Sequence, residues 1–155
     1  MKTKNILTFL LLIFISFGYS QKKELRNANK FYDSGEYLSA LDLLETSMSM
    51  FDSSDDKIKS QVMLLYGKIY TSTEDFELAI KSFNNSRELG VSGQDLNSEI
   101  NKLETAIITS AIADNETENF SDASKKLKMV YDINPENNGL YLYCLLYTSP
   151  SPRDA

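Results

Sequence analysis

The feature that most constrains the fold is a pattern of apolar residues in the middle of the chain. Residues 62–89, VMLLYGKIYTSTEDFELAIKSFNNSREL, contain two runs of apolar side chains at helical spacing, separated by a polar break at residues 71–75. The faces expected to be buried are Val62, Leu65, Tyr66, Ile69 and Tyr70 in the first run and Phe76, Ala79, Ile80, Phe83 and Ser86 in the second. The pattern predicts two amphipathic helices joined by a tight turn, with Thr73 as the N-cap of the second helix.

Small residues lie among the large ones in both predicted helices. Gly67 is inside the first, although glycine in a helix costs roughly 1 kcal/mol relative to alanine. Close approach of a neighbouring helix is the expected reason for it. Ala79 lies between Phe76 and Phe83, where a small side chain would let two backbones come together.

These residues resemble the signature of the tetratricopeptide (TPR) family, a helical repeat of about 34 residues. With Gly67 at the eighth position of the motif, Ala79 falls at the twentieth and Phe83 at the twenty-fourth, while Met63 and Val91 replace the family's Trp and closing Pro. The resemblance implies an all-α fold, a TPR-like α-solenoid of antiparallel helix pairs that share a continuous core. The structural positions that it assigns are Ala28, Gly35, Tyr37, Ala40, Gly67, Tyr70, Phe76, Ala79, Phe83, Phe120, Ala123 and Pro135.

Weaker copies of the pattern lie on both sides of the central one. We expect repeats at about residues 22–50, 56–90 and 94–135, and the start of a fourth from residue 138. Residues 51–56 would be a polar link in which Ser53 and Asp56 begin the next helix as a capping-box-like pair. The third repeat would open with a long helix from about Gln94 to Asn115. Its apolar face is expected at Leu96, Ile100, Leu103, Ile107 and Ala111.

The first twenty residues are typical of a secretory signal peptide. Lys2 and Lys4 precede an apolar run at residues 6–17, and Gly18 and Ser20 supply the small residues expected before cleavage at Gln21. An uncleaved membrane anchor is the alternative, although the run is shorter than the ~20 residues that span a bilayer. Since no Cys lies near the site, a lipoprotein anchor is not expected. We therefore predict an exported protein, periplasmic or associated with the cell envelope.

The last twelve residues, 144–155, have a different character. The string CLLYTSPSPRDA looks like the translation of a transposase-adapter sequence used in DNA library preparation, which agrees codon by codon from Cys144 to Asp154. A native Pro-rich tail is the alternative. The adapter interpretation implies a gene interrupted near Tyr143 and makes the single Cys foreign. Because each repeat buries its apolar face on the next, the last complete helix pair should then expose apolar surface.

Composition excludes several functions. The chain has no His, so it cannot form a Ser-His or Cys-His nucleophilic pair or bind a metal through imidazole. Removing the three cations and one carboxylate of the two ends (Lys2, Lys4, Arg153 and Asp154) from the net charge of −6 leaves −8 for residues 21–143. A chain this acidic is not expected to bind nucleic acid. We predict no enzymatic activity, no cofactor and no metal.

Three groups of polar or aromatic residues resemble functional sites, but each has a more favoured structural interpretation. Asp55 and Asp56 fall at a helix start, where they would interact with the helix dipole rather than with a metal. The carboxylates of Asp114, Glu116 and Glu118 lack the Gly and distal Glu of a calcium loop and are typical of a solvated loop. An aromatic cage for a cation, built from Tyr37, Tyr66 and Tyr70, is less favoured than packing at these positions.

The TPR resemblance also implies a binding surface, the concave face formed by the first helix of each pair. Matching positions one by one assigns to it Lys22, Leu25, Asn29 and Tyr32 from the first repeat and Gln61, Leu64, Lys68 and Thr71 from the second. The family's carboxylate clamp for peptide chain ends matches at Asn29, but Leu25 stands where the clamp has Lys. The groove would instead offer mixed apolar and polar contacts to an extended segment or a helix of a protein partner.

The function predicted from the sequence is therefore a non-enzymatic protein–protein interaction scaffold in the periplasm or cell envelope, with a partner of unknown identity. The alternative is that these repeats form the N-terminal sensory or interaction region of a larger membrane signalling or peptidoglycan-binding envelope protein.

Overall fold

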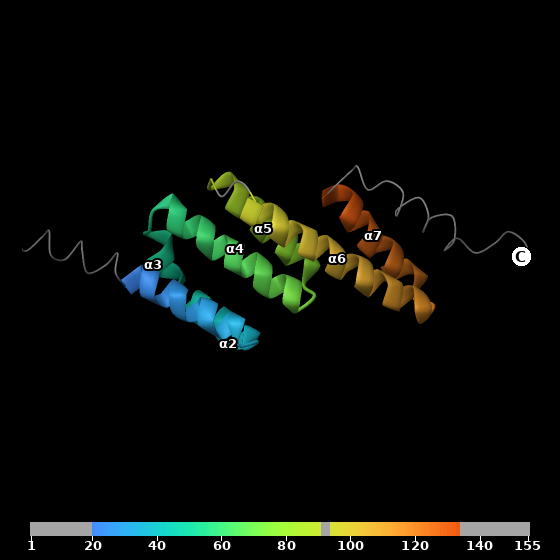
Figure 1. Cartoon of the computed structure of the whole chain (residues 1–155), viewed down its shortest axis with the longest axis horizontal. Helices are drawn as coiled ribbons and strands as arrows, with labels where there is room; N and C mark the ends of the chain where they lie inside the picture. Colours follow the sequence, from blue (N-terminus) through green and yellow to red (C-terminus); the bar gives the residue numbers. More distant parts are fainter. Residues whose placement is uncertain (1–19, 91–93, 134–155) are drawn as a thin grey trace, which may run out of the picture.

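The computed structural model describes residues 20–90 and 94–133, and all regular secondary structure in these residues is helical (Figure 1). Residues 20–33 are helical and are called the N-terminal helix below. The helices that follow are α2 (Tyr37–Thr46), α3 (Met48–Asp52), α4 (Asp56–Ser72), α5 (Phe76–Glu88), α6 (Gln94–Glu116) and α7 (Phe120–Ile133). The predicted all-α fold is confirmed. Residues 1–19 of the predicted signal peptide, Pro135, the fourth repeat and residues 144–155 lie outside the described residues.

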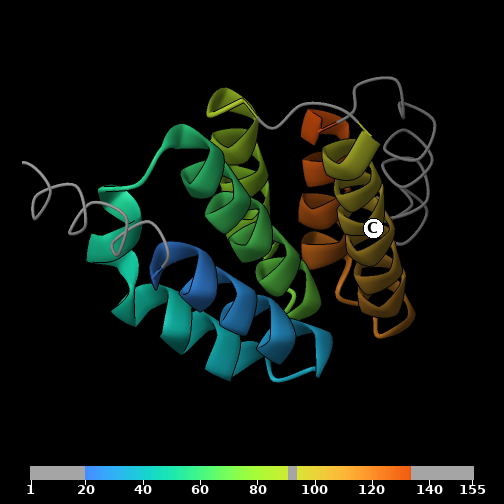
Figure 2. The same cartoon turned by 60° about the vertical axis from the view of Figure 1, so that its left-hand side comes forward.

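Consecutive long helices form antiparallel hairpins joined by short turns. The N-terminal helix pairs with α2, α4 with α5 and α6 with α7 (Figures 1 and 2). Neighbouring hairpins are in contact, because α4 packs against α2 and α6, and α5 packs against α6. The N-terminal helix and α4 run side by side in the same direction (Figure 2).

The same turn closes all three hairpins. Each turn contains one residue with left-handed backbone, which is Gly35 (φ 79°), Glu74 (φ 63°) or Glu118 (φ 63°). The amide of the next residue donates a hydrogen bond to the carbonyl five residues earlier: Glu36 N to Phe31 O (2.8 Å), Asp75 N to Tyr70 O (2.9 Å) and Asn119 N to Asp114 O (2.8 Å). This bonding satisfies carbonyls left free at a helix C-terminus. The turns stand five residues before the equivalent alanines Ala40, Ala79 and Ala123.

The small residues predicted to allow close packing are buried. Ala28, Ala40, Ala79 and Ala123 are each 0% exposed. At Gly67 a side chain is excluded by the facing helix, since a Cβ atom there would lie 2.8 Å or less from three ring carbons of Phe83. The predicted reason for this glycine, close approach of a neighbouring helix, is therefore confirmed.

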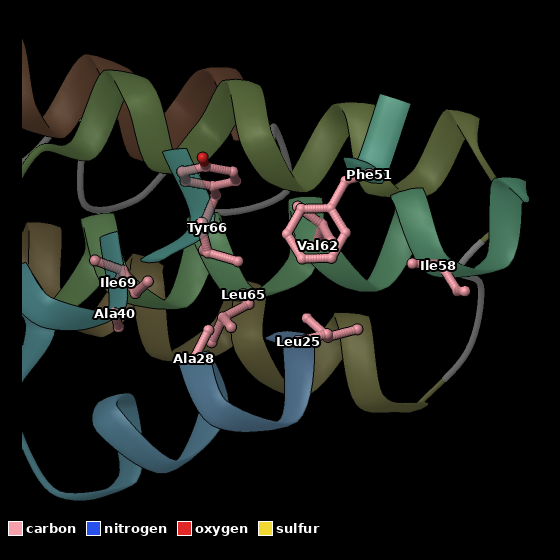
Figure 3. Packing of buried hydrophobic residues seen from close by; sticks show 10 residues of the cluster. Leu25, Ala28, Ala40, Phe51, Ile58, Val62, Leu65, Tyr66 and Ile69 are labelled. Atoms are coloured by element: carbon pink, nitrogen blue, oxygen red, sulfur yellow. The ribbon is translucent and has the colours of Figure 1, made fainter. Parts of the chain in front are cut away.

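Two clusters of buried residues form the core. The first joins the N-terminal helix, α2, α3 and α4, and Figure 3 shows its side chains meeting between the N-terminal helix and α4. The second joins α5, α6 and α7. Leu64 and Tyr70 of α4 pack against the second cluster, so α4 connects the two. Of the five apolar positions predicted in α6, four are buried and Ile100 is half-buried.

The first repeat differs from the prediction in its second helix. Ser47 separates α2 from the short helix α3, and α3 brings Phe51 into the first cluster with 2% of its surface exposed. The prediction that residues 51–56 are a polar link is therefore wrong at Phe51, which is part of a helix and buried. Burial of a phenylalanine side chain stabilises a fold by about 1.5–3 kcal/mol, which favours this arrangement over an exposed link. Gln21 Nε2 donates a hydrogen bond to Met50 O (3.0 Å), which holds α3 against the N-terminal helix.

Two predicted helix caps are also wrong. The N-cap of α4 is Asp55, whose carboxylate accepts a hydrogen bond from Ile58 N (2.8 Å), rather than Ser53. This geometry confirms the interpretation of Asp55 as a helix-start residue. Thr73 ends α4 instead of capping α5, because the left-handed Glu74 places the N-cap of α5 at Asp75.

Phe120 was predicted as a packing position, yet it is 42% exposed. Its equivalent, Phe76, is only 5% exposed, because it packs in the second cluster beneath the α6–α7 hairpin. Among the described residues no helix follows α7 to cover Phe120 in the same way. Residues 20–90 and 94–133 contain no helix that is long and apolar enough to cross a membrane.

Candidate functional site

A hollow with a volume of about 450 Å³ lies between the N-terminal helix and α4. We call it the trough. Its lining comes from both helices and comprises Lys22, Leu25, Arg26, Asn29, Gln61, Leu64, Leu65 and Lys68. Six of these eight were assigned to the concave face from the sequence, and the structure brings them together around one hollow.

Helix periodicity explains why these side chains meet. On the N-terminal helix the lining residues fall at positions 22, 25, 26 and 29, and on α4 at 61, 64, 65 and 68. Both sets follow the same i, i+3, i+4, i+7 spacing, which places the members of each set on one face of a helix. Seven residues of helix rise about 10 Å. The trough is therefore an elongated site that follows two helices for about two turns.

The floor of the trough is apolar. Leu25 and Leu65 are 7% and 2% exposed and belong to the first core cluster, while Leu64 is half-buried. Leu25 was predicted as a surface contact of the concave face. Leu25 does line the trough, but it also packs in the core (Figure 3) and can offer a ligand only the edge of its side chain.

The rim of the trough is cationic. Lys22 and Arg26 are exposed on the N-terminal helix, and Lys68 is half-buried on α4. The Lys68 ammonium group lies 4.4 Å from the centre of the Tyr32 ring, a cation–π contact that orients the lysine. Asn29 and Gln61 supply the remaining polar groups, and Asn29 Nδ2 donates a hydrogen bond to Leu25 O (2.8 Å).

Two residues predicted for the concave face do not line the trough. Tyr32 lies beneath Lys68 and contacts Tyr37, with ring centres 5.6 Å apart. Thr71 is half-buried, and its hydroxyl donates a hydrogen bond to Gly67 O (2.8 Å) within its own helix. Arg26 was not predicted, although its position one helical turn after Lys22 was a usable signal.

The tyrosines of α4 pack as predicted rather than forming an open cage. Tyr66 and Tyr70 stack with ring centres 5.8 Å apart, and Tyr66 is only 5% exposed. Burial raises the pKa of the Tyr66 hydroxyl well above its usual range, and neighbouring Tyr70, Glu45 and Asp52 act in the same direction. The buried hydroxyl of Tyr66 has no hydrogen-bond partner among the described residues.

The interpretation of Asp114, Glu116 and Glu118 as a solvated loop is wrong for the first two residues, which belong to α6. Asp114 lies within α6, and its Oδ2 is 2.6 Å from the Lys126 ammonium group of α7. Glu118 occupies the left-handed position of the last turn, and Glu116 is the last residue of α6. Within the described part of the chain, no three His, Cys, Asp or Glu residues are arranged to hold a metal ion.

A second hollow, of about 270 Å³, lies between α5, α6 and α7. It is lined by Ile80, Phe83, Asn84, Arg87, Ile100, Leu103, Asp132 and Ile133. Here the lining contains one cation and one carboxylate. An excess of positive charge thus distinguishes the trough from this hollow.

Comparison with known proteins finds no match to a family model, to a curated protein or to a solved structure. The physical character of the trough is therefore the basis on which a function can be proposed.

Proposed function

We propose that this protein is a non-enzymatic interaction scaffold that binds a segment of another protein in the trough. Its helix hairpins would stack as a TPR-like α-solenoid, with the N-terminal helix and α4 as neighbouring first helices of the array. In keeping with the pattern of residues 1–20, this binding would take place in the periplasm or at the cell envelope.

The observation that carries the proposal is the composition of the trough. An apolar floor of Leu25, Leu64 and Leu65 is bordered by hydrogen-bonding and charged side chains. Protein-binding grooves combine these two features, because apolar burial supplies affinity and polar rim groups fix the register of the bound chain. A width of two helices and a length of about 10 Å suit a short peptide segment better than a flat protein surface.

The repeated turns and alanines give separate support to the stacked arrangement. The three hairpins share the left-handed turn residue and an alanine five residues later. The contacts of α4 with α2 and α6, and of α5 with α6, are the contacts expected where each helix pair covers the next.

The test is peptide selection on the intact chain, using an unbiased library of displayed peptides. A Gln61→Trp variant blocks the trough with an indole, since Gln61 is exposed and lines it. The matched control is Glu88→Trp, which adds the same side chain to an exposed position of α5. We expect selected peptides to bind the parent chain and the control equally and to bind Gln61→Trp at least about tenfold more weakly.

Circular dichroism of both variants checks that helicity is retained. A library that yields no binding peptide, or peptides that bind Gln61→Trp as well as the parent chain, would reject the trough as the binding site.

A further inference from the structure

We infer that the segment bound in the trough is acidic, with two or more side-chain carboxylates that flank an apolar residue. This inference rests on the proposed function and adds the chemical class of the ligand.

The trough is a cluster of positive charge. The trough gathers Lys22, Arg26 and Lys68, and no Asp or Glu is part of its lining. The whole chain carries a net charge of −6, so a cluster of three positive charges is opposite in sign to the rest of the chain. Like charges held together repel each other, and a ligand of opposite charge removes that cost on binding.

The ion pairs of the described residues leave the three cations of the trough un-neutralised. The four ion pairs found within residues 20–90 and 94–133 are Lys102–Glu99, Lys125–Asp122, Lys126–Asp114 and Lys128–Asp132. None of them involves a cation of the trough. The contact of Lys68 is with the face of the Tyr32 ring, which orients its ammonium group without neutralising it. Carboxylates of a ligand can therefore pair with these three cations without displacing an existing ion pair.

Spacing determines which acidic segment fits. Lys22 and Asn29 mark the two ends of the trough on the N-terminal helix, and Gln61 and Lys68 mark them on α4. The ends are about 10 Å apart, a length covered by about three residues of extended chain. Carboxylates at positions i and i+3 would reach Lys22 and Lys68, with an apolar side chain between them over Leu25 and Leu64.

The same spacing favours side-chain carboxylates over a chain end. The cations are distributed along two helical turns instead of converging on one point, so a single terminal carboxylate would leave two of them without a partner. An internal segment can satisfy all three. Phosphates of nucleic acid are a poorer match, because the negative chain would repel a long polyanion outside the trough.

The experiment compares two synthetic peptides, each acetylated and amidated so that neither carries a charged end. One has the core Glu-Leu-Leu-Glu within a Gly-Ser context, and the other has the isosteric core Gln-Leu-Leu-Gln. Binding to the intact chain is followed by fluorescence anisotropy. We expect the acidic peptide to bind at least about tenfold more tightly at low salt and the difference to shrink at 0.5 M salt.

A triple variant, Lys22→Gln, Arg26→Gln and Lys68→Gln, removes the cations of the trough. Its control changes Lys23, Lys30 and Lys81 to Gln, which alters the net charge equally at exposed positions outside the trough. The acidic peptide should lose about tenfold in affinity on the trough variant and less than about twofold on the control. If the triple variant loses helicity, the double variant Lys22→Gln, Arg26→Gln, which changes only exposed side chains, provides the same comparison.

Equal binding of the acidic and amide peptides, or equal losses on the two triple variants, would overturn the inference. A free chain end that improves binding more than the side-chain carboxylates would assign the cations to a terminal carboxylate instead. Selection of apolar or basic peptides that Gln61→Trp excludes would leave the proposed function standing and reject only the acidic ligand.

Discussion

The α4–α5 and α6–α7 hairpins share one backbone design but fill their interfaces with different side chains. Both close on a left-handed glutamate, Glu74 or Glu118, with the same hydrogen bond from the following amide. Both place a fully buried alanine, Ala79 or Ala123, five residues after that glutamate. The differences lie at equivalent positions between the helices.

The first difference is in the sizes of the side chains that face each other between the two helices of each hairpin. In the α4–α5 hairpin Gly67 faces the large ring of Phe83. The equivalent residues of the α6–α7 hairpin, counted from the shared alanine, are Ala111 and Leu127, which are also buried. A larger residue on one helix is therefore matched by a smaller one on the other, as close packing requires.

The second difference is in polarity. The stacked Tyr66 and Tyr70 of α4 are replaced in α6 by Ser110 and Asp114 at the equivalent positions. Lys126 of α7 fills the space and pairs with both, lying 2.8 Å from Ser110 Oγ and 2.6 Å from Asp114 Oδ2. The same hairpin backbone thus accommodates an aromatic interface in one copy and an ionic interface in the other.

The largest effect is expected from Gly67→Ala, which breaks the volume match in the α4–α5 hairpin. The added methyl group would overlap the buried Phe83 ring, so we expect a loss of about 2 kcal/mol in the free energy of unfolding, despite the better helix propensity of alanine. Urea titration followed by circular dichroism measures it.

A double variant sharpens the same test. Gly67→Ala with Phe83→Leu recreates the Ala and Leu combination of the α6–α7 hairpin. We expect it to be more stable than the sum of the two single changes predicts, because each change relieves the defect of the other. Strict additivity would mean that the two residues do not share one packing site.

Lys126→Ser should have the next largest effect, because it removes the ionic partner in the α6–α7 hairpin. The Lys126 and Asp114 side chains are only 24% and 20% exposed, so the carboxylate would be left half-buried and unpaired. We expect a loss of about 1–2 kcal/mol, between the values for surface and fully buried pairs. Thermal unfolding of the intact chain is the measurement.

The adjacent Lys125 supplies a matched control. Its ion pair with Asp122 is 69% and 61% exposed, and Lys125→Ser should change stability by less than about 0.5 kcal/mol. Equal effects of the two substitutions would contradict the assignment of Lys126 as a supporting side chain of the interface.

Helical periodicity made much of the fold predictable from the sequence. The helical spacing located α4, α5 and α6, and the small residues Gly67 and Ala79 were correctly assigned to packing. The left-handed conformation of the turns was harder to predict. Glycine at position 35 is typical of such a conformation, but glutamate, which occupies the other two left-handed positions, is not. The break at Ser47 was missed for a related reason, since no Gly or Pro marks it.

The trough could be located in part. The TPR resemblance assigned six of its lining residues to one binding face, and their i, i+3, i+7 spacing on each helix agrees with a shared face. Whether Leu25 is a surface contact or part of the floor depends on how closely α4 approaches, a property of tertiary packing. The contact of Lys68 with Tyr32 depends likewise on the angle between the two helices.

Among the buried interface positions the smallest effect is expected at Tyr66, whose hydroxyl lacks the partner that Ser110 has at the equivalent position of α6. Tyr66→Phe removes the unsatisfied group and should raise the free energy of unfolding by about 1 kcal/mol at pH 7.

The same hydroxyl should also make stability depend on pH. Burial raises the pKa of Tyr66 in the folded state, so the unfolded chain loses the hydroxyl proton at a lower pH, and stability falls as the pH rises above about 10. In Tyr66→Phe that decline should be shallower than in Tyr70→Phe, which alters a less buried hydroxyl. Urea titrations between pH 7 and pH 11 distinguish them, and identical profiles would show that the Tyr66 hydroxyl is solvated.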